Sequence, residues 1–312
     1  MDRLELLKQV KDMGFKYIRI SLTKDCNGAC SFCHNEGQKI GKRGDKASPT
    51  LPLLSLKDYE YIAKFFRTTL SSVSFTGGEP TLVSNLPEII KIFKDNGYKT
   101  SMTTNGFLLD KTLQEKLANV GLDKINVSVP SLDEKEYSGM YNVQNKLPTV
   151  LMNLESLSQV FKGKCKINYM ALLNKNTPEQ LIPMSNLSGK LGIPISFLTI
   201  LNNNTDYMSS YVLSYLKDNI GIQNTEIQDG KFGSKTIYTL NNGAKWEFDD
   251  FREEQYRQKA FDNEECQKCP VRKVCVEGPY ALRISSDGTI RKCLIRKNNL
   301  IPLTKNGYCH EK

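Results

Sequence analysis

The apolar positions of the first 200 residues follow two periods in alternation. Short runs rich in β-branched and aromatic residues are typical of buried strands, and longer segments with apolar residues three and four apart are typical of amphipathic helices. The first pattern predicts six strands, at residues 17–22, 72–76, 98–103, 124–129, 165–172 and 195–200. The second predicts helices before and between them, at residues 1–14, 55–69, 85–97, 110–121, 146–161 and 177–192.

Local signals mark the ends of several of these helices. Ser55 and Asp58 have the spacing of a capping box at the start of the second helix. Asn85 is suited to cap the third helix, and Gly97 is suited to end it. Residue types at the helix ends therefore agree with the periodicity.

Helical connections between consecutive strands require parallel pairing, because each helix returns the chain to the same end of the sheet. Six strand–helix units are two short of a closed eightfold barrel. We therefore expect an α/β fold, a partial (β/α)6 barrel of the TIM type, over residues 1–200. Its functional site should lie at the carboxyl ends of the strands.

The pattern changes after residue 200. Residues 236–248 predict a β-hairpin that turns at residues 241–243, and residues 280–294 predict a second hairpin around Asp287 and Gly288. We expect a small cap that contains these hairpins over residues 201–312.

Composition and charge narrow the class of protein. The chain has 312 residues, of which 39% are hydrophobic and 25% are charged, which is typical of a globular protein. The formal net charge of +9 suits an anionic small molecule, but no dense basic run favours nucleic acid. Charged residues interrupt every apolar run and the amino-terminal segment, so we expect a cytoplasmic protein without a membrane span.

The cysteines are the most informative residues. Nine cysteines, an odd number in a chain of this kind, argue against a disulfide framework. Cys26, Cys30 and Cys33 have the spacing C-x3-C-x2-C on the loop after the first strand. Three thiolates would leave one iron of a four-iron cluster open. A zinc site completed by His34 is the alternative on spacing alone.

A second group of cysteines lies near the C-terminal hairpin. Cys266, Cys269, Cys275 and Cys293 have the spacing C-x2-C-x5-C-x17-C. Four thiolates suit either a structural zinc ion or a fully ligated iron–sulfur cluster, and the spacing does not choose between them.

The segment RISLTKDCNGACSFCHNEG, residues 19–37, resembles the start of the radical S-adenosylmethionine (SAM) enzymes. In that family three cysteines bind a [4Fe-4S] cluster whose open iron chelates SAM, and one electron cleaves SAM to a 5′-deoxyadenosyl radical. The resemblance implies that Cys26, Cys30 and Cys33 are the ligands of this catalytic cluster.

Three further segments resemble that family in the expected order, namely FTGGEPTL at 75–82, MTTNG at 102–106 and NVSVPSLD at 126–133. The resemblance assigns contacts with SAM to Phe32, Gly77, Gly78, Glu79, Asn105 and Ser128. It implies that the aromatic ring packs beside the adenine, that the glycines allow close backbone approach, and that the carboxylate accepts the methionine ammonium.

The chain resembles most the branch of the family that contains GTP 3′,8-cyclase, whose second [4Fe-4S] cluster has three cysteine ligands and binds GTP. Cys266, Cys269 and Cys293 match those ligands, and Cys275 is additional. The first arginine of the cyclase's Arg-x-Arg pair is replaced by Ala281, and the sequence ends in CHEK in place of Gly-Gly. A closed second cluster resembles the twitch or shortened SPASM caps of other radical enzymes.

The sequence therefore predicts a radical SAM enzyme with two [4Fe-4S] clusters. It would abstract a hydrogen atom from a small molecule, such as a nucleotide or sugar, to rearrange, cyclise or oxidise it. Arg19 and Arg283 are candidate ligands for an anionic substrate group. A one-electron donor such as flavodoxin or ferredoxin is implied. The alternatives are GTP 3′,8-cyclase, a peptide-modifying maturase, and a non-catalytic iron–sulfur or zinc protein.

Overall fold

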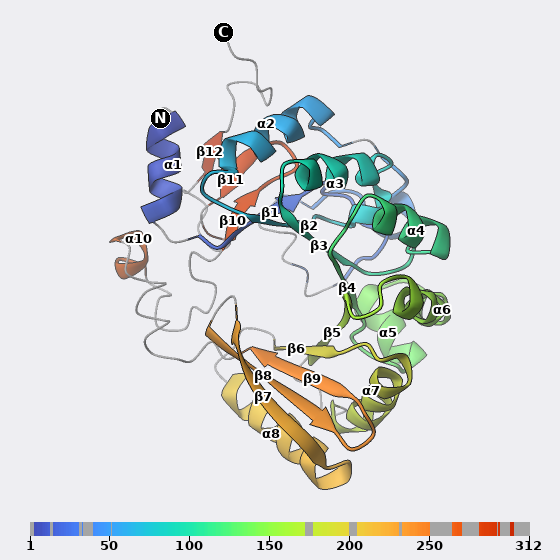
Figure 1. Ribbon diagram of the computed structural model, residues 1–312. Helices are drawn as coiled ribbons and strands as arrows, with labels where there is room; N and C mark the ends of the chain where they lie inside the picture. Colours follow the sequence, from blue (N-terminus) through green and yellow to red (C-terminus); the bar gives the residue numbers. More distant parts are fainter. Residues whose placement is uncertain are drawn as a thin grey trace. The chain divides into compact units, whose positions relative to one another are not determined.

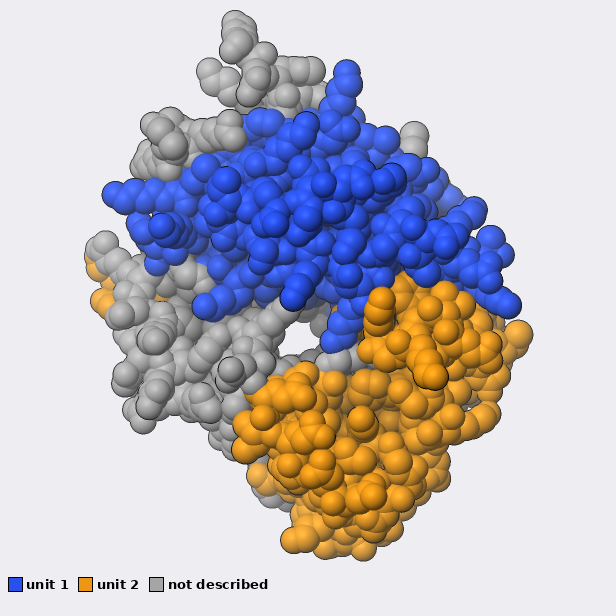
Figure 2. Space-filling model, in the orientation of Figure 1, with its two compact units in different colours: residues 1–125, 141–143, 277–312 blue, residues 126–140, 144–276 orange. Residues whose placement is uncertain are grey.

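The fold is that of a computed structural model, which describes part of the chain. The described residues are 3–12, 15–30, 33, 40–50, 52–171, 177–199, 205–230, 233–249, 264–269, 281–291, 293 and 300–302. Contacts divide the chain into two compact units (Figure 2). Unit 1 comprises residues 1–125, 141–143 and 277–312, and unit 2 comprises residues 126–140 and 144–276. The core and cap expected on either side of residue 200 remain a prediction.

Unit 1 is built on a mixed sheet with a parallel centre. Its strands are β1 (Tyr17–Ser21), β2 (Ser72–Thr76), β3 (Lys99–Thr104), β10 (Ala281–Ile284), β11 (Thr289–Arg291) and β12 (Leu300–Pro302). They are ordered β12-β11-β10-β1-β2-β3. β1, β2 and β3 pair in parallel, as predicted. β10 and β11 form the predicted C-terminal hairpin, and β10 adds to β1 in parallel, which the sequence analysis did not foresee.

The helices of unit 1 begin and end close to their predicted positions. They are α1 (Arg3–Asp12), α2 (Leu56–Phe66), α3 (Leu86–Asp95) and α4 (Lys111–Asn119), with the short 3-10 helices η2 (Gly44–Lys46) and η3 (Pro80–Leu82). The capping box of Ser55 and Asp58 is present in full. Asn85 is the N-cap residue of α3, as predicted, although its side chain makes no capping hydrogen bond.

The core of unit 1 lies between the sheet and two helices. α2 and α3 lie side by side against one face of the sheet (Figure 1). Phe93 of α3 meets Phe75 of β2 edge to face, with ring centroids 5.4 Å apart. The hydroxyl of Tyr98 donates to the Ala63 carbonyl of α2 at 2.8 Å. Because successive residues of a strand face opposite ways, the other face of the same strands carries polar side chains.

Unit 2 contains both parallel and antiparallel strand pairs, with its own helices. Its strands are β5 (Cys165–Ala171), β6 (Ile195–Thr199), β9 (Lys245–Asp249), β8 (Gly233–Leu240) and β7 (Ile222–Gly230), and β4 (Lys124–Ser128) leads into it from unit 1. Its helices are α5 (Glu134–Tyr141), α6 (Leu147–Val160), α7 (Thr177–Leu191), α8 (Thr205–Asn219) and α10 (Glu264–Gln267). β5, β6 and β9 pair in parallel, and β8 pairs antiparallel with both β9 and β7.

The core of unit 2 is centred on the hairpin predicted at residues 236–248. Trp246 is fully buried, and its indole nitrogen donates to the Ser185 hydroxyl of α7 at 2.9 Å. Phe197 of β6 lies beside Phe248, with ring centroids 5.1 Å apart. The helix α8 and the strand β7 were not predicted. In the described part of the chain, no helix is long and apolar enough to cross a membrane.

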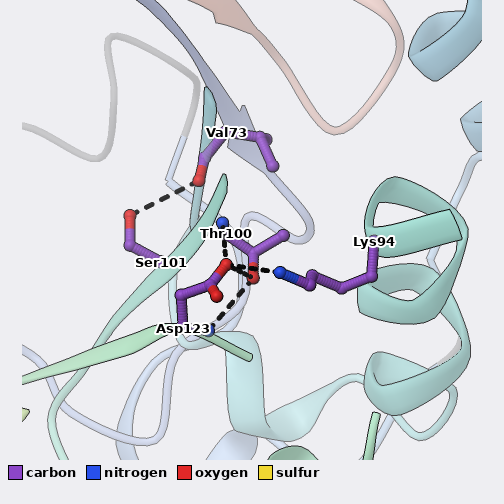
Figure 3. A network of polar contacts seen from close by, with 5 residues as sticks. All are labelled: Val73, Lys94, Thr100, Ser101 and Asp123. Atoms are coloured by element: carbon purple, nitrogen blue, oxygen red, sulfur yellow. Dashed lines mark hydrogen bonds and ion pairs between the residues drawn. The ribbon is translucent and has the colours of Figure 1, made fainter. Parts of the chain in front are cut away.

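A network of polar contacts joins α3 and β3 to the turn before β4 (Figure 3). Asp123 accepts hydrogen bonds from the backbone nitrogen of Thr100 at 2.7 Å and from its hydroxyl at 3.0 Å. The ammonium of Lys94 lies 2.7 Å from the same carboxylate. Partial burial alone would raise the pKa of Asp123, but these three donors together outweigh it and lower the pKa.

We expect Asp123→Ala to lower the free energy of unfolding by about 1–2 kcal/mol, because three donors lose a charged acceptor that is 42% exposed. A lowered pKa in the folded state contributes stability above the unfolded pKa, which is lost as the pH falls. Urea unfolding at pH 7 and at pH 3 measures both effects, and the difference from the unsubstituted chain should narrow at pH 3.

The control for this network is Asp95→Ala, which removes an exposed pair with Lys91 one helical turn away. Its cost should stay below about 0.5 kcal/mol. An equal cost for the two substitutions would contradict a special role for the carboxylate of Asp123.

Candidate functional site

The loop that follows β1 continues beside the turn that follows β2. The nitrogen of Leu22 donates to the carbonyl of Thr76 at 2.8 Å. Beyond the strands, Gly78 N donates to Thr23 O at 2.6 Å and Glu79 N donates to Asp25 O at 2.8 Å. The chain therefore reaches Cys26 along a path held by backbone hydrogen bonds from the neighbouring turn.

This close approach explains the two glycines of the turn. A Cβ atom on Gly77, whose φ is +151°, would lie 2.6 Å from the Thr23 carbonyl oxygen. A Cβ atom on Gly78 would overlap the carbonyl oxygen of Asp25. We expected these glycines to allow another part of the molecule to approach the backbone closely. In the structure, the segment that lies against them is the backbone of the cysteine loop.

The three cysteines of this loop influence one another electrostatically. Cys26 is buried, and Cys30 and Cys33 are half-buried. Burial, followed by the charge of Glu79, raises the pKa of the Cys26 thiol to about 11. Burial and then the charges of Cys26 and Cys33 raise the pKa of Cys30 to about 12. Cationic iron would offset this cost of burying thiolates, and its binding would release protons.

A second segment, residues 40–46, lies against the cysteine loop. The nitrogen of Cys26 donates to Lys42 O at 2.9 Å, and its carbonyl accepts from Gly44 N at 3.0 Å. Arg43, between these two, places both terminal guanidinium nitrogens 3.6 Å from the sulfur of Cys33. The sequence analysis missed Arg43, because neither its spacing nor its neighbours distinguish it from other basic residues.

Glu79 is a buried carboxylate that connects the ends of β2 and β3. One of its oxygens accepts from the nitrogen and hydroxyl of Thr81 and from the hydroxyl of Thr104. The other accepts from the nitrogen of Asn105 at 2.8 Å. Burial raises the pKa of Glu79, and these hydrogen bonds oppose the rise. The carboxylate therefore holds the two strand ends together, and its contact with a methionine ammonium stays a prediction.

Asn105 reaches from the end of β3 to the cysteine loop. Its amide nitrogen donates to the Asn27 side chain at 2.7 Å and lies 3.9 Å from the sulfur of Cys26. Its amide oxygen accepts from the nitrogen of Phe107 at 3.1 Å. The structure thus brings Asn105 and Glu79 together with Cys26, at the strand ends where the site was expected.

Three further candidates lie outside the described part of unit 1. Ser128 ends β4 in unit 2. Phe32 and His34 lie outside the described residues. Around the described residues, no three His, Cys, Asp or Glu side chains are placed to hold a single metal ion. That geometry concerns one ion, whereas a four-iron cluster binds each cysteine at a separate iron atom. The thiols of Cys26, Cys30 and Cys33, on the loop beside the turn of Gly77 and Gly78, fit such a cluster.

The second group of cysteines is described in part. Cys266 lies on α10, and the nitrogen of Cys269 donates to its carbonyl at 3.1 Å. Cys293 follows β11 in unit 1, and Cys275 lies outside the described residues.

The two arginines predicted to meet substrate lie on neighbouring strands of unit 1. Arg19 of β1 is the register partner of Arg283 of β10, and Arg283 in turn pairs with Arg291 of β11. On the other side, Arg19 pairs with Ser74 of β2. Register partners project to the same face of a sheet, so the arginines form one row on the face opposite α2 and α3.

Comparison with known proteins identifies the class. Residues 20–183 match the family model of the radical SAM superfamily. The chain belongs to this superfamily and is a radical SAM enzyme, which implies SAM, a [4Fe-4S] cluster, a small-molecule substrate and an electron donor. This class and the parallel strands confirm the expected α/β fold of the partial TIM type.

Its curated relatives include archaeal enzymes named probable GTP 3′,8-cyclase. That of Saccharolobus islandicus is 31% identical over 92% of this chain and 85% of its own length. That of Pyrococcus abyssi is 27% identical over 92% and 87%, respectively. The crystal structure of Streptococcus suis SuiB bound to S-adenosylmethionine aligns with a TM-score of 0.62 at 19% identity, over 96% of this chain. The present chain spans 64% of the length of SuiB.

We expect Gly78→Ala to destabilise the protein by about 1–3 kcal/mol, because the added methyl group overlaps the backbone of the cysteine loop. Displacement of that loop should also reduce the iron bound on anaerobic reconstitution. Thermal unfolding and iron content per chain measure the two effects. Gly139→Ala is the matched control, since a Cβ atom there meets nothing within 4 Å.

Proposed function

We propose that this enzyme generates its radical at a cluster held by Cys26, Cys30 and Cys33 and acts on an anionic small molecule. The observation that carries the substrate class is the register pairing of Arg19 with Arg283. Cys26, Cys30 and Cys33 would hold the cluster, and SAM bound to it would supply the radical chemistry for abstraction of a hydrogen atom. The chain's own residues must bind the two ligands, orient them and exclude water.

The arginine row supports an anion because it gathers guanidinium groups from adjacent strands on one face of the sheet. Arg283 is buried, with 8% exposure, and its guanidinium donates to the Ala281 carbonyl at 3.3 Å. Arg19 beside it is half-buried. A phosphate or carboxylate of the substrate, bound across both guanidinium groups, would accept bidentate hydrogen bonds from them.

A second candidate function is the GTP 3′,8-cyclase reaction, which the names of the curated relatives favour. GTP is anionic and would suit the arginine row. Cys275 and Ala281, which depart from the cyclase pattern, weigh against it.

We infer a second [4Fe-4S] cluster from the spacing of Cys266, Cys269, Cys275 and Cys293. With four thiolates the cluster would be closed and could not chelate a substrate, so it would transfer electrons or support the fold of a twitch-like cap. A flavodoxin or ferredoxin would deliver electrons one at a time.

Cys30→Ala tests the ligand assignment of the first cluster. The reconstituted variant should lose the formation of 5′-deoxyadenosine from SAM under reducing, anaerobic conditions by at least a hundredfold, and it should lose about four irons per chain. The control is Cys165→Ala, which lies outside both cysteine groups. Cleavage of SAM at the normal rate by Cys30→Ala would remove this triad from the catalytic cluster.

Substitution of the arginine row tests the substrate class, with GTP as the probe. Arg19→Gln and Arg283→Gln should each weaken GTP binding about tenfold to a hundredfold, the cost of about 1.5–3 kcal/mol for a lost charged hydrogen bond. Lys99→Gln, which removes an exposed charge at the start of β3, should leave the affinity unchanged. Equilibrium dialysis with labelled GTP makes the measurement.

Product analysis separates the two candidate functions. If the unsubstituted enzyme converts GTP to a cyclised product, the second candidate becomes its function. If GTP neither binds nor reacts while SAM is still cleaved, the cyclase reaction is excluded and another anionic substrate is required.

A further inference from the structure

Arg43 is held beside the cysteine loop by its backbone. Asp25 anchors the segment before it, because its carboxylate accepts from Lys42 N at 2.7 Å. The hydrogen bonds of Cys26 with Lys42 and Gly44 then flank Arg43 on both sides, and Cys26 and Arg43 themselves form an isolated parallel β-bridge. The position of this residue relative to the cysteines is therefore built into the fold.

The side chain of Arg43 extends from this fixed backbone to Cys33. Both of its terminal nitrogens lie 3.6 Å from the sulfur, within the range of hydrogen bonds to sulfur. Its remaining nitrogen, Nε, is buried and has no hydrogen-bond partner in the described part of the chain. The forked guanidinium is thus directed at a single cysteine sulfur.

The charge of Arg43 acts on all three cysteines. It lowers the pKa of Cys26 and of Cys30, against the larger effect of burial. Burial lowers the pKa of Arg43, but its electrostatic interaction with the three cysteines, Cys33 most of all, outweighs this effect and raises the pKa. Glu79 is the carboxylate whose charge opposes Arg43 at Cys26.

We propose that Arg43 raises the reduction potential of the SAM-binding cluster by donating hydrogen bonds to the sulfur of Cys33 and by placing a positive charge beside the cysteine triad. The proposal rests on the assignment of Cys26, Cys30 and Cys33 as the ligands of that cluster. Hydrogen bonds to cluster sulfurs and net charge near a cluster are the means by which proteins set such potentials.

Reduction adds one electron from the external donor to the cluster, and no bond forms or breaks. The cluster with its thiolates becomes more negative by one unit. A fixed cation at Cys33 stabilises the reduced form more than the oxidised form, so a one-electron donor of given potential reduces a larger fraction of the enzyme.

The test is a redox titration of the reconstituted holoenzyme, followed by electron paramagnetic resonance. We score only the reduced-cluster signal that changes when SAM is added. This criterion distinguishes the SAM-binding cluster from any other cluster in the protein. Arg43→Gln removes the charge, and the ratio of reduced to oxidised cluster at a fixed potential should fall about tenfold, equivalent to a midpoint lower by about 59 mV. Arg43→Lys keeps the charge without the fork and should give about a threefold fall.

Lys46→Gln is the matched control, because it removes an exposed charge from the same segment, and its ratio should stay within twofold of the unsubstituted enzyme. A ratio within twofold for Arg43→Gln overturns the proposal. If Arg43→Gln binds no iron, the proposal is overturned instead by an unchanged ratio of reduced to oxidised cluster in Arg43→Lys. Cys30→Ala distinguishes failure of the ligand assignment from failure of the proposal for Arg43. A SAM-responsive signal that survives this substitution contradicts the ligand assignment. Loss of the signal supports the assignment on which the test of Arg43 depends.

Discussion

The candidate site depends on one close contact between two backbones. The cysteine loop can run beside the turn after β2 because Gly77 and Gly78 have no side chains, and the hydrogen bonds to Thr23 O and Asp25 O hold it there. The position of Cys26 follows from this contact, and the segment that carries Arg43 is attached to Cys26 in turn. A shift of the turn would therefore move the thiols and their charged neighbour together.

A buried carboxylate reinforces the same contact from the other side. Glu79 follows the two glycines and accepts hydrogen bonds from Thr104 and Asn105 at the end of β3, while Asn105 reaches back to the cysteine loop. Burial of a carboxylate is costly unless it is well hydrogen-bonded, and the raised pKa of Glu79 reflects that cost. All of these donors come from the protein itself, at the end of β3 and in the short helix η3.

Local patterns predicted most of unit 1, and long-range pairing explains what they missed. Residues 72–76 form β2 with the predicted bounds. A short apolar run between two turns is too short for a helix and therefore predicts a strand. The strand β7 was missed because its side chains are mostly exposed and its pairing with β8 is through the backbone. The helix α8 was detectable, since Val212 and Leu216 are buried four residues apart, but its polar start at Thr205 resembled a loop. Arg43 had no signal, because its role arises only from the bridge to Cys26.

The parallel pairing of β10 with β1 also bears on the substrate. It joins segments more than 260 residues apart and places Arg283 beside Arg19, which no local pattern predicts. Ala281, where the cyclase pattern has its other arginine, pairs with Tyr17 on the same face and is buried. Arg291 lies across from Arg283 on β11. Compared with the cyclase pattern, this face therefore lacks the cation at position 281 of β10 but has one on the neighbouring strand β11. An anion bound to this row would lie farther toward the hairpin than one bound between two arginines of β10, and this is one of the differences between the chain and the cyclase pattern.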